Sequence, residues 1–254
     1  MYADQAKPTI SIVIPTRNEA QNLSYLLPQI PADIEEIILV DGHSTDDTIA
    51  VAQKLRSDIR IIQQTGIGKG DAMRAGFVAC TQDIIVMLDA DGSADPAEIP
   101  FFVDALKRGG DFAKGSRYLK GGGSSDITPL RQAGNWALCV LTNLLFREKF
   151  TDLCYGYNVF WRRCLDLVTL DAMGFDIEAQ LCLRMLKAGV RMVEVSSMEH
   201  SRVFGESNLN TFKDGWLVLK VIVFEWMHQS VPQLAPKQQQ SATISMHTSE
   251  ELSL

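Results

Sequence analysis

The 254-residue chain has no excess of basic residues, no long uninterrupted apolar run and no closely spaced cysteines. Its formal net charge of −7 argues against the clustered Lys and Arg surface of a nucleic-acid-binding protein, so we expect no nucleic-acid partner. The apolar stretch 216–227 is interrupted by Lys220 and Glu225 and is too short for a membrane-spanning helix, which needs ~20 residues. Three interpretations of this stretch stay open: membrane-surface contact, burial in the protein's own core, and contact with a partner.

The five cysteines are odd in number, scattered and without CxxC spacing, which favours free thiols in a reducing compartment. The N-terminal stretch MYADQAKPTISIVIP has no charged segment followed by a long apolar core, so it predicts no signal peptide. We therefore expect a cytoplasmic protein.

Apolar β-branched runs alternate with helix-like segments in the first half: TISIVIP, EEIILVD, IRIIQQ and DIIVMLD are separated by stretches such as STDDTIAVAQKLR. This rhythm predicts an α/β fold with a Rossmann-like, mostly parallel central sheet flanked by helices. Ser44 is expected to cap the helix that follows it. The pattern predicts one domain over residues 1–230 and a polar, disordered tail over 231–254.

The stretch IIVMLDADGSADP, residues 84–96, runs from a buried strand into Asp89 and Asp91. Ligands bind at the carboxyl ends of strands in open α/β sheets, so these carboxylates are expected to face a ligand. Two carboxylates one residue apart can share Mg²⁺ or Mn²⁺, which then bridges to a diphosphate. Alone, this pattern is weak, because loop-capping aspartates produce it too.

The glycine-rich TGIGKG, residues 65–70, also precedes a predicted helix. It matches neither a dinucleotide fingerprint, which needs glycine at Asp71, nor a Walker A sequence, which needs Ser or Thr at Gly70. A helix-start loop near a nucleotide and simple turn chemistry both remain open.

An ordered set of motifs raises the significance of these matches: SIVIPTRNEAQNL, IILVDGHSTDDT, GIGKGDAMRAGF, VMLDADGSADP and GSRY. With PLRQAGN, DLCYGYNVFWRR, FDIEAQL and HSRVFGESN, the chain resembles glycosyltransferase family 2, which has the GT-A fold. The later motifs are similar to the branch of dolichyl-phosphate mannose synthases, which charge polyprenyl phosphates with a sugar. The resemblance spans residues 9–210.

The resemblance implies roles for particular side chains in a nucleotide-sugar site. Those implied to line the donor pocket are Pro15, Arg17, Glu19, Asp41, Lys69, Asp89 and Arg202. Those implied to hold the metal are Asp89, Asp91 and Ser93, and the catalytic set adds two phosphate-facing arginines, Arg117 and Arg131.

The implied function is metal-dependent, inverting transfer of a hexose from a GDP- or UDP-linked sugar to a polyprenyl phosphate. A peripheral membrane contact, or a membrane-embedded partner, would then present the acceptor. A glycan or small-molecule hydroxyl acceptor is the alternative, and it needs a carboxylate base, for which Asp176 and Glu178 are candidates that equally suit loop support. A non-catalytic nucleotide-sugar-binding protein is the alternative of another class.

Three asparagines depart from the pattern of the polyprenyl-phosphate branch. Asn135 stands where a serine is usual, Asn158 where an arginine is frequent, and Asn208 where a lysine is common. Each departure alters or removes a phosphate-binding group.

Overall fold

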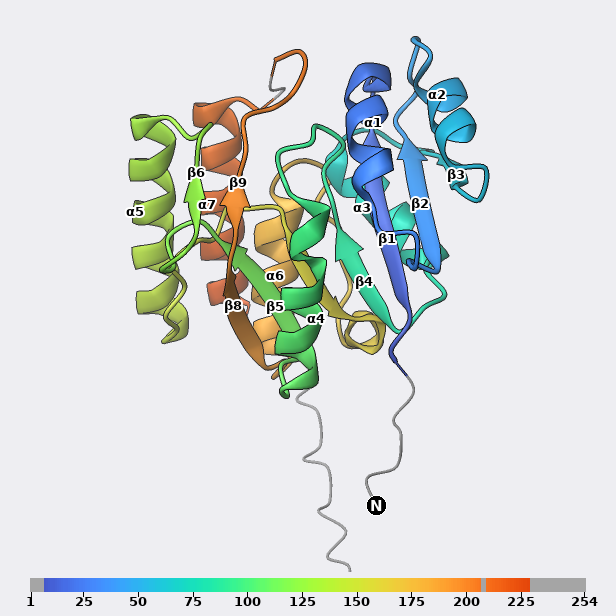
Figure 1. Cartoon of the computed structure of the whole chain (residues 1–254). Helices are drawn as coiled ribbons and strands as arrows, with labels where there is room; N and C mark the ends of the chain where they lie inside the picture. Colours follow the sequence, from blue (N-terminus) through green and yellow to red (C-terminus); the bar gives the residue numbers. More distant parts are fainter. Residues whose placement is uncertain (1–6, 207–208, 229–254) are drawn as a thin grey trace, which may run out of the picture.

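A computed structural model describes residues 7–206 and 209–228 and shows a sheet covered by helices on both faces (Figure 1). The predicted tail 231–254 and Asn208 lie outside the described residues. The described part contains a seven-stranded sheet of order β3-β2-β1-β4-β7-β5-β8. These strands are β1 (Ile10–Thr16), β2 (Glu36–Asp41), β3 (Arg60–Gln63), β4 (Ile84–Met87), β5 (Phe112–Ser116), β7 (Asn158–Trp161) and β8 (Met192–Ser196).

The pairing in this sheet is parallel except around β7, which runs antiparallel to both β4 and β5. A mostly parallel sheet is what the sequence predicts, and the prediction is confirmed. Because β7 joins β4 to β5, the two halves of the chain form one continuous sheet.

Side chains alternate between the two faces of the sheet, as the period of two in a strand requires. Ile12 and Ile14 face one helical layer, formed by α1 (Ala20–Leu26), α2 (Thr48–Leu55) and α4 (Ile99–Lys107). Val13 faces the other layer, formed by α3 (Lys69–Ala79) and α6 (Ile177–Lys187). Continuous burial on both faces explains why these strands read as unbroken apolar runs.

Two further helices, α5 (Pro129–Phe146) and α7 (Thr211–Met227), pack against each other and against α6. In Figure 1 they stand beside the sheet, on the side away from β3. Two short strands, β6 (Gly123–Ser124) and β9 (Met198–Glu199), pair in parallel near them. Short 3₁₀ turns complete the chain at η1 (Leu27–Gln29), η2 (Pro96–Glu98) and η3 (Arg162–Leu167).

The loop before α2 differs from the sequence-based expectation for Ser44. The Ser44 hydroxyl accepts a hydrogen bond from the Asn18 backbone N–H at 2.9 Å, so it ties two loops together and caps no helix. The backbone N–H of Thr48, the first residue of α2, donates a hydrogen bond to the Asp46 carboxylate at 3.1 Å. The prediction for Ser44 was wrong because a long-range loop contact competes for its hydroxyl.

The glycine-rich loop before α3 has a packing reason for two of its glycines. A Cβ on Gly68 would lie 2.2 Å from the carbonyl oxygen of Met173, and one on Gly70 would lie 2.3 Å from that of Ala172. Gly68 also has a φ of +96°, which other residues rarely adopt. The loop is therefore built for close backbone approach between α3 and the segment before α6.

No helix within residues 7–206 or 209–228 is long and apolar enough to cross a membrane. The stretch 216–227 forms most of α7, whose Val218 and Ile222 are buried against α5 and α6. All five cysteines carry free thiols.

Candidate active site

An open cleft of about 1340 Å³ lies at the carboxyl ends of β1 and β4 and continues between these strands and the N-terminal halves of α5 and α7. It brings together most of the residues that the sequence marks as functional. Those lining it are Pro15, Arg17, Glu19, Lys69, Asp89, Asp91, Ser93, Arg117, Arg131, Glu178 and Arg202. Asp41 and Asp176 do not line it.

Asp89 follows the buried strand β4 and forms an ion pair with Lys69, which stands in the first turn of α3. The ammonium lies 2.6 Å from Asp89 Oδ1 and 2.5 Å from Glu178 Oε1 at the start of α6. The Glu178 side chain is 8% exposed, whereas that of Asp89 is 36% exposed. Lys69 thus joins an accessible carboxylate on the cleft floor to a buried one behind it.

These three charges depend on one another. Burial disfavours the ammonium of Lys69, but attraction to Asp89 and Glu178 outweighs that cost and raises its pKa above the ordinary lysine value. Burial also raises the pKa of Glu178, against the opposing attraction of Lys69. A cation held between two carboxylates is suited to fixing both at the cleft floor.

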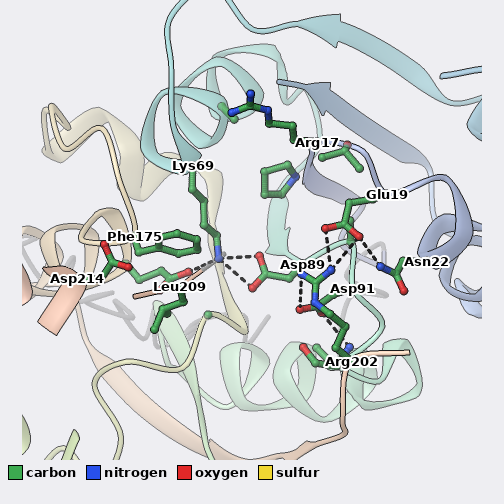
Figure 2. A pocket seen from close by; sticks show the side chains of 18 of the residues that line it. Arg17, Glu19, Asn22, Lys69, Asp89, Asp91, Phe175, Arg202, Leu209 and Asp214 are labelled. Atoms are coloured by element: carbon green, nitrogen blue, oxygen red, sulfur yellow. Dashed lines mark hydrogen bonds and ion pairs between the residues drawn. The ribbon is translucent and has the colours of Figure 1, made fainter. Parts of the chain in front are cut away.

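A second cation, Arg202, is held on the opposite side of the Asp-x-Asp sequence (Figure 2). Its Nη1 donates to both oxygens of Glu19 at 3.0 and 3.1 Å, and its Nη2 lies 3.4 Å from Asp91 Oδ2. Its Nε is buried and makes no hydrogen bond with the described residues. Asn22 anchors the loop after Arg202 by exchanging hydrogen bonds with the backbone of Phe204 at 2.8 and 3.1 Å.

The remaining residues predicted to line the donor pocket differ in accessibility. Pro15 is half-buried at the end of β1, and Arg17 is exposed beside it. Asp41, by contrast, is 1% exposed, and its carboxylate accepts hydrogen bonds from the Ser44 backbone N–H at 3.1 Å and from Gln63 Nε2 at 3.1 Å. Asp41 therefore shapes the loop after β2 and does not line the cleft.

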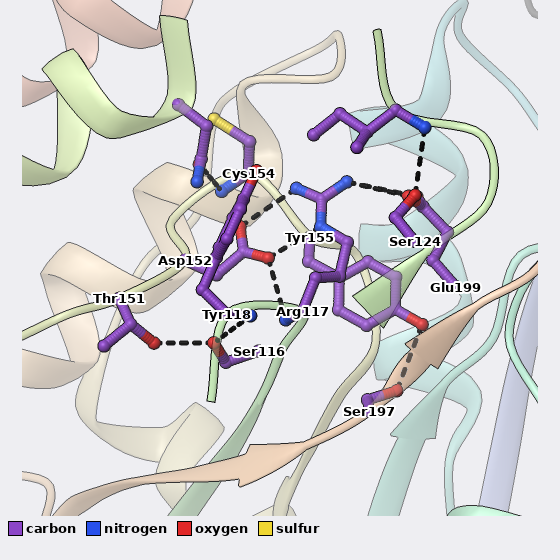
Figure 3. A network of polar contacts seen from close by, with 12 residues as sticks. Ser116, Arg117, Tyr118, Ser124, Thr151, Asp152, Cys154, Tyr155, Ser197 and Glu199 are labelled. Carbon is purple, nitrogen blue, oxygen red and sulfur yellow. Dashed lines mark hydrogen bonds and ion pairs between the residues drawn. The ribbon is translucent and has the colours of Figure 1, made fainter. Parts of the chain in front are cut away.

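Arg117 stands after β5 between two carboxylates (Figure 3). Its Nε and Nη2 form a two-point pair with Asp152 at 2.7 and 3.0 Å, and its Nη1 lies 3.0 Å from Glu199 Oε2. The guanidinium also lies 5.0 Å from the centre of the Tyr155 ring. Because its side chain is 8% exposed and its charge is compensated twice, Arg117 holds the cleft wall together.

Arg131, in the first turn of α5, has only weak, neutral partners among the described residues. Its Nε lies 3.3 Å from the Thr211 hydroxyl, and its Nη2 lies 3.4 Å from the carbonyl oxygen of Leu209. One turn later, Asn135 is 4% exposed and accepts hydrogen bonds from the backbone N–H groups of Leu153 and Cys154 at 3.2 and 3.1 Å. The amide nitrogen of Asn135 is buried and has no hydrogen-bond partner in the described part of the chain.

Sequence reasoning assigned no role to several side chains that build this site. Asp152 and Glu199 compensate Arg117, and Asp214 lines the cleft while accepting a hydrogen bond from the Asn210 backbone N–H at 2.7 Å. Asp152 and Glu199 are 35 and 82 residues from Arg117 in the sequence, so no local pattern marks these pairs. Of the two candidate bases, Glu178 lies in the cleft, whereas Asp176 accepts a hydrogen bond from the Gly174 backbone N–H at 3.1 Å.

The comparison with known proteins identifies the family. The family model described as glycosyl transferase family 2 matches residues 11–167, more than half of the chain. The chain belongs to glycosyl transferase family 2.

Two relatives of this glycosyltransferase are similar to it over most of its length. It is 30% identical over 218 residues to the dolichol-phosphate mannosyltransferase of Pyrococcus furiosus, covering 79% of this chain and 59% of that longer protein. It is 29% identical over 212 residues to the polyprenol monophosphomannose synthase of Mycolicibacterium smegmatis, covering 78% and 80% of the two chains. The predicted similarity to the polyprenyl-phosphate branch is confirmed.

A solved structure shares the fold. Glucosyl-3-phosphoglycerate synthase from Mycobacterium tuberculosis, in complex with Mn²⁺, uridine diphosphate and glucosyl-3-phosphoglycerate, matches with a TM-score of 0.70. The two chains are 20% identical, and the match covers 90% of this chain and 82% of the other. The predicted GT-A fold is confirmed.

The carboxylates of this glycosyltransferase fit a divalent metal held jointly with a substrate. No group of three or more His, Cys, Asp or Glu side chains among the described residues is arranged to hold a metal ion. Asp91 uses Oδ1 to accept a hydrogen bond from the Ser93 backbone N–H at 3.0 Å and has only the 3.4 Å contact of Arg202 at Oδ2. Mg²⁺ is commonly bound by one or two carboxylates plus substrate phosphates, so this incomplete set suits it.

Proposed function

We propose that this family 2 glycosyltransferase transfers a hexose from a GDP- or UDP-linked sugar to a polyprenyl phosphate, with inversion at the anomeric carbon and with Mg²⁺ or Mn²⁺. The observation that carries the donor half is the convergence of Asp89 and Asp91 with Lys69 and Arg202 at one strand end. The solved relative that contains Mn²⁺ and uridine diphosphate supports the same choice of ligands.

The charges in the cleft explain why a metal would be needed. Acidic side chains outnumber basic ones along its wall: Glu19, Asp46, Asp47, Asp89, Asp91, Asp126, Glu178, Glu199, Glu206 and Asp214 face Arg17, Lys69, Arg117, Arg131 and Arg202. A diphosphate would be repelled from such a surface unless a divalent cation accompanied it. When bound to Asp89 and Asp91, the metal would stabilise the charge that develops on the leaving diphosphate.

The cations around Asp89 and Asp91 would complete this stabilisation. Arg202 has an unpartnered Nε beside the metal carboxylates, and it can donate to the diphosphate without leaving Glu19. Lys69 would keep Asp89 in place from below. Since the acceptor phosphate already carries a negative charge, a single direct displacement needs no strong general base.

Arg131 and Asn135 support a phosphate acceptor at the other end of the cleft. Both line the cleft, and the amide nitrogen of Asn135 is a buried donor without a partner among the described residues. Because Arg117 is already compensated by two carboxylates, we assign the direct contact with the acceptor phosphate to Arg131 and Asn135 and a supporting role to Arg117.

The outer surfaces of the two helices beside this end support a lipid acceptor. On α5, Trp136, Val140 and Leu144 recur every four residues and are 68%, 47% and 75% exposed. On α7, Phe212 and Trp216 are 77% and 57% exposed. Aromatic residues on the exposed side of a helix are typical of contact with a membrane surface. We therefore propose a cytoplasmic protein that binds the membrane peripherally, alone or through a membrane-embedded partner.

One observation favours the hydroxyl-acceptor alternative. Glu178 lines the cleft, and burial raises its pKa, which suits a general base. Its ion pair with Lys69 argues for a supporting role instead, because a paired carboxylate is a weaker base. No comparable observation favours a binding protein without catalysis.

The test supplies each of GDP- and UDP-hexoses with Mn²⁺ and offers three acceptors separately: a short-chain polyprenyl phosphate, the matching neutral prenol, and simple saccharides. The proposal expects product on the lipid phosphate alone, with the anomeric configuration inverted relative to the donor. Transfer to a saccharide and never to the lipid phosphate would replace it with the hydroxyl-acceptor reaction, and Glu178→Gln would then be tested first.

A further inference from the structure

A buried lysine lies directly behind the cleft floor. Lys114 is the central residue of β5, the strand next to the edge strand β8, and is 0% exposed. It does not line the cleft. Its ammonium donates to the carbonyl oxygen of Tyr155 at 3.0 Å and lies 3.4 Å from Asn158 Oδ1. Both partners are neutral, and Nζ forms no ion pair within the described part of the chain. Glu194 faces Lys114 in register on β8, but its carboxylate accepts hydrogen bonds from Thr151 and Asp152.

A buried lysine without a carboxylate partner destabilises the folded state. Removing an ammonium from water costs several kcal/mol even after the protein relaxes, and buried lysines are usually paired with a carboxylate. An apolar side chain would fill the same place in the sheet without this cost, as Phe112 does two residues earlier on the same face. The position therefore requires an explanation other than packing.

The two side chains together hold one short segment of the chain. Lys114 and Asn158 are paired in register across β5 and β7. Lys114 binds the carbonyl oxygen of Tyr155, and Asn158 Nδ2 donates to that of Gly156 at 3.0 Å. Asn158 is itself 1% exposed. Two consecutive carbonyl groups are thus fixed from below by two buried donors.

Gly156 brings this segment into contact with the cleft cluster. A Cβ built on Gly156 would lie 2.8 Å from Glu178 Oε1, 3.1 Å from Asp89 Oδ2 and 3.4 Å from Lys69 Nζ. The backbone at this position therefore packs directly against all three charged groups, with no room for a side chain. A shift of the segment by a few tenths of an ångström would therefore move the Asp89 carboxylate.

The electrostatic field of Lys114 adds to this mechanical link. The positive charge acts on the Glu178 carboxylate through the intervening segment. In front of it, Lys69 forms ion pairs with both Asp89 and Glu178. Lys114 therefore adds positive charge behind the cleft floor without occupying the cleft.

We propose that Lys114 and Asn158 are positioning residues for the transfer reaction: they fix the Tyr155–Gly156 backbone, which in turn seats Asp89, Glu178 and Lys69. The inference rests on the proposed donor chemistry at Asp89. It differs from the branch resemblance, in which position 158 frequently carries an arginine, because the cation here comes from the neighbouring strand.

The register pairing allows the cation to be moved rather than merely deleted. In Lys114→Met the ammonium is lost while the length of the side chain is nearly kept. In Lys114→Val/Asn158→Lys the ammonium starts from the directly facing position on β7, on the same face of the sheet. Leu106→Ala on α4, a buried residue outside the cleft, serves as the control for general destabilisation.

The first measurement needs no substrate. Hydrogen–deuterium exchange of residues 153–157 is expected to rise at least tenfold in Lys114→Met, to return toward wild type in the double variant, and to stay unchanged in Leu106→Ala. Exchange that rises uniformly over the sheet, or that does not change at 153–157, would overturn the proposal. This result stands whether or not the wild-type enzyme uses a polyprenyl phosphate.

The second measurement separates an effect on positioning from an effect on stability. It uses steady-state kinetics at a temperature where every variant is folded, with any acceptor that the wild-type enzyme turns over. Lys114→Met is expected to lower kcat at least tenfold while KM for the nucleotide sugar changes less than threefold, and the double variant is expected to recover at least a third of the loss on a logarithmic scale. A kcat equal to that of wild type in Lys114→Met would refute the positioning role. A wild type without any transfer to polyprenyl phosphate would refute the proposed acceptor and leave the exchange result intact.

Discussion

Replacing Asp91 by asparagine tests the proposed metal site with little structural disturbance. Asp91 lies after the end of β4, and its side chain is 20% exposed. Asparagine keeps the oxygen that accepts the Ser93 backbone N–H and removes one negative charge. Single substitutions destabilise a protein by about 1 kcal/mol on average, so the fold is expected to persist. Arg202 retains its contacts with Glu19, so the loop that carries it is expected to stay in place.

The expected effect on catalysis is far larger than the effect on folding. Losing one preorganised electrostatic contact to a developing charge typically lowers kcat by ~10²–10³, or ~3–4 kcal/mol of transition-state stabilisation. A carboxylate that binds the metal directly contributes at least this much, because metal affinity falls with it. We therefore expect Asp91→Asn to lower kcat/KM by at least ~10²-fold and to abolish the dependence of donor binding on Mn²⁺.

The assay measures nucleoside diphosphate release over a Mn²⁺ titration, together with calorimetric binding of the donor with and without metal. Asp95→Asn is the matched control, since Asp95 accepts the Ala97 backbone N–H at 2.8 Å at the start of η2 and does not line the cleft. Because asparagine caps a helix about as well as aspartate, Asp95→Asn is expected to change neither the stability nor the dependence of turnover on Mn²⁺ appreciably. Equal Mn²⁺-dependent turnover of wild type and Asp91→Asn would refute the metal assignment.

Three further predictions concern packing and burial. Gly156→Ala is expected to lower kcat at least tenfold by displacing Glu178 and Asp89, and a kcat equal to that of wild type would contradict this. Gly134→Ala, on helix α5, adds a Cβ that would meet nothing within 4 Å, so it should raise the melting temperature by ~2–4 °C. Glu225→Gln should lower the free energy of unfolding in urea by ~3 kcal/mol, because it leaves Lys187 without a carboxylate partner among the described residues and Arg184 with Asp171 alone. An unchanged urea midpoint would contradict this. Burial raises the pKa of Cys80 to about 12, so its thiol should react with a disulfide reagent at pH 8 only after the protein unfolds. Rapid labelling of Cys80 in the native protein would contradict this prediction.

The sequence predicted the first half of the sheet well because local signals and tertiary structure agree there. The apolar runs that form β1, β2 and β4 are buried on both faces, whereas the edge strand β3 is only half-buried. The two aspartates after β4 line the cleft. The similarity of motifs then identified the family. Neither step required knowledge of contacts between distant segments.

The rest could not be predicted because it depends on which segments meet. Nothing local marks β7 as antiparallel between β4 and β5, and a lone lysine at position 114 gives no sign that it will be buried opposite Asn158. The same holds for Arg117, which the motif suggests as a phosphate ligand but which the fold places between Asp152 and Glu199. Which carboxylate pairs with which cation depends on contacts between segments that are distant in the sequence.

The most direct test of the account measures release of GDP or UDP from the matching nucleotide hexoses, with polyprenyl phosphate present, in Mn²⁺ and in excess chelator. The account predicts diphosphate release that needs both the lipid phosphate and the metal and that matches the glycosylated lipid mole for mole. Release that persists unchanged in chelator, or a protein that turns over no nucleotide sugar with any acceptor, would contradict the claim that the Asp89 and Asp91 cleft carries out metal-dependent sugar transfer.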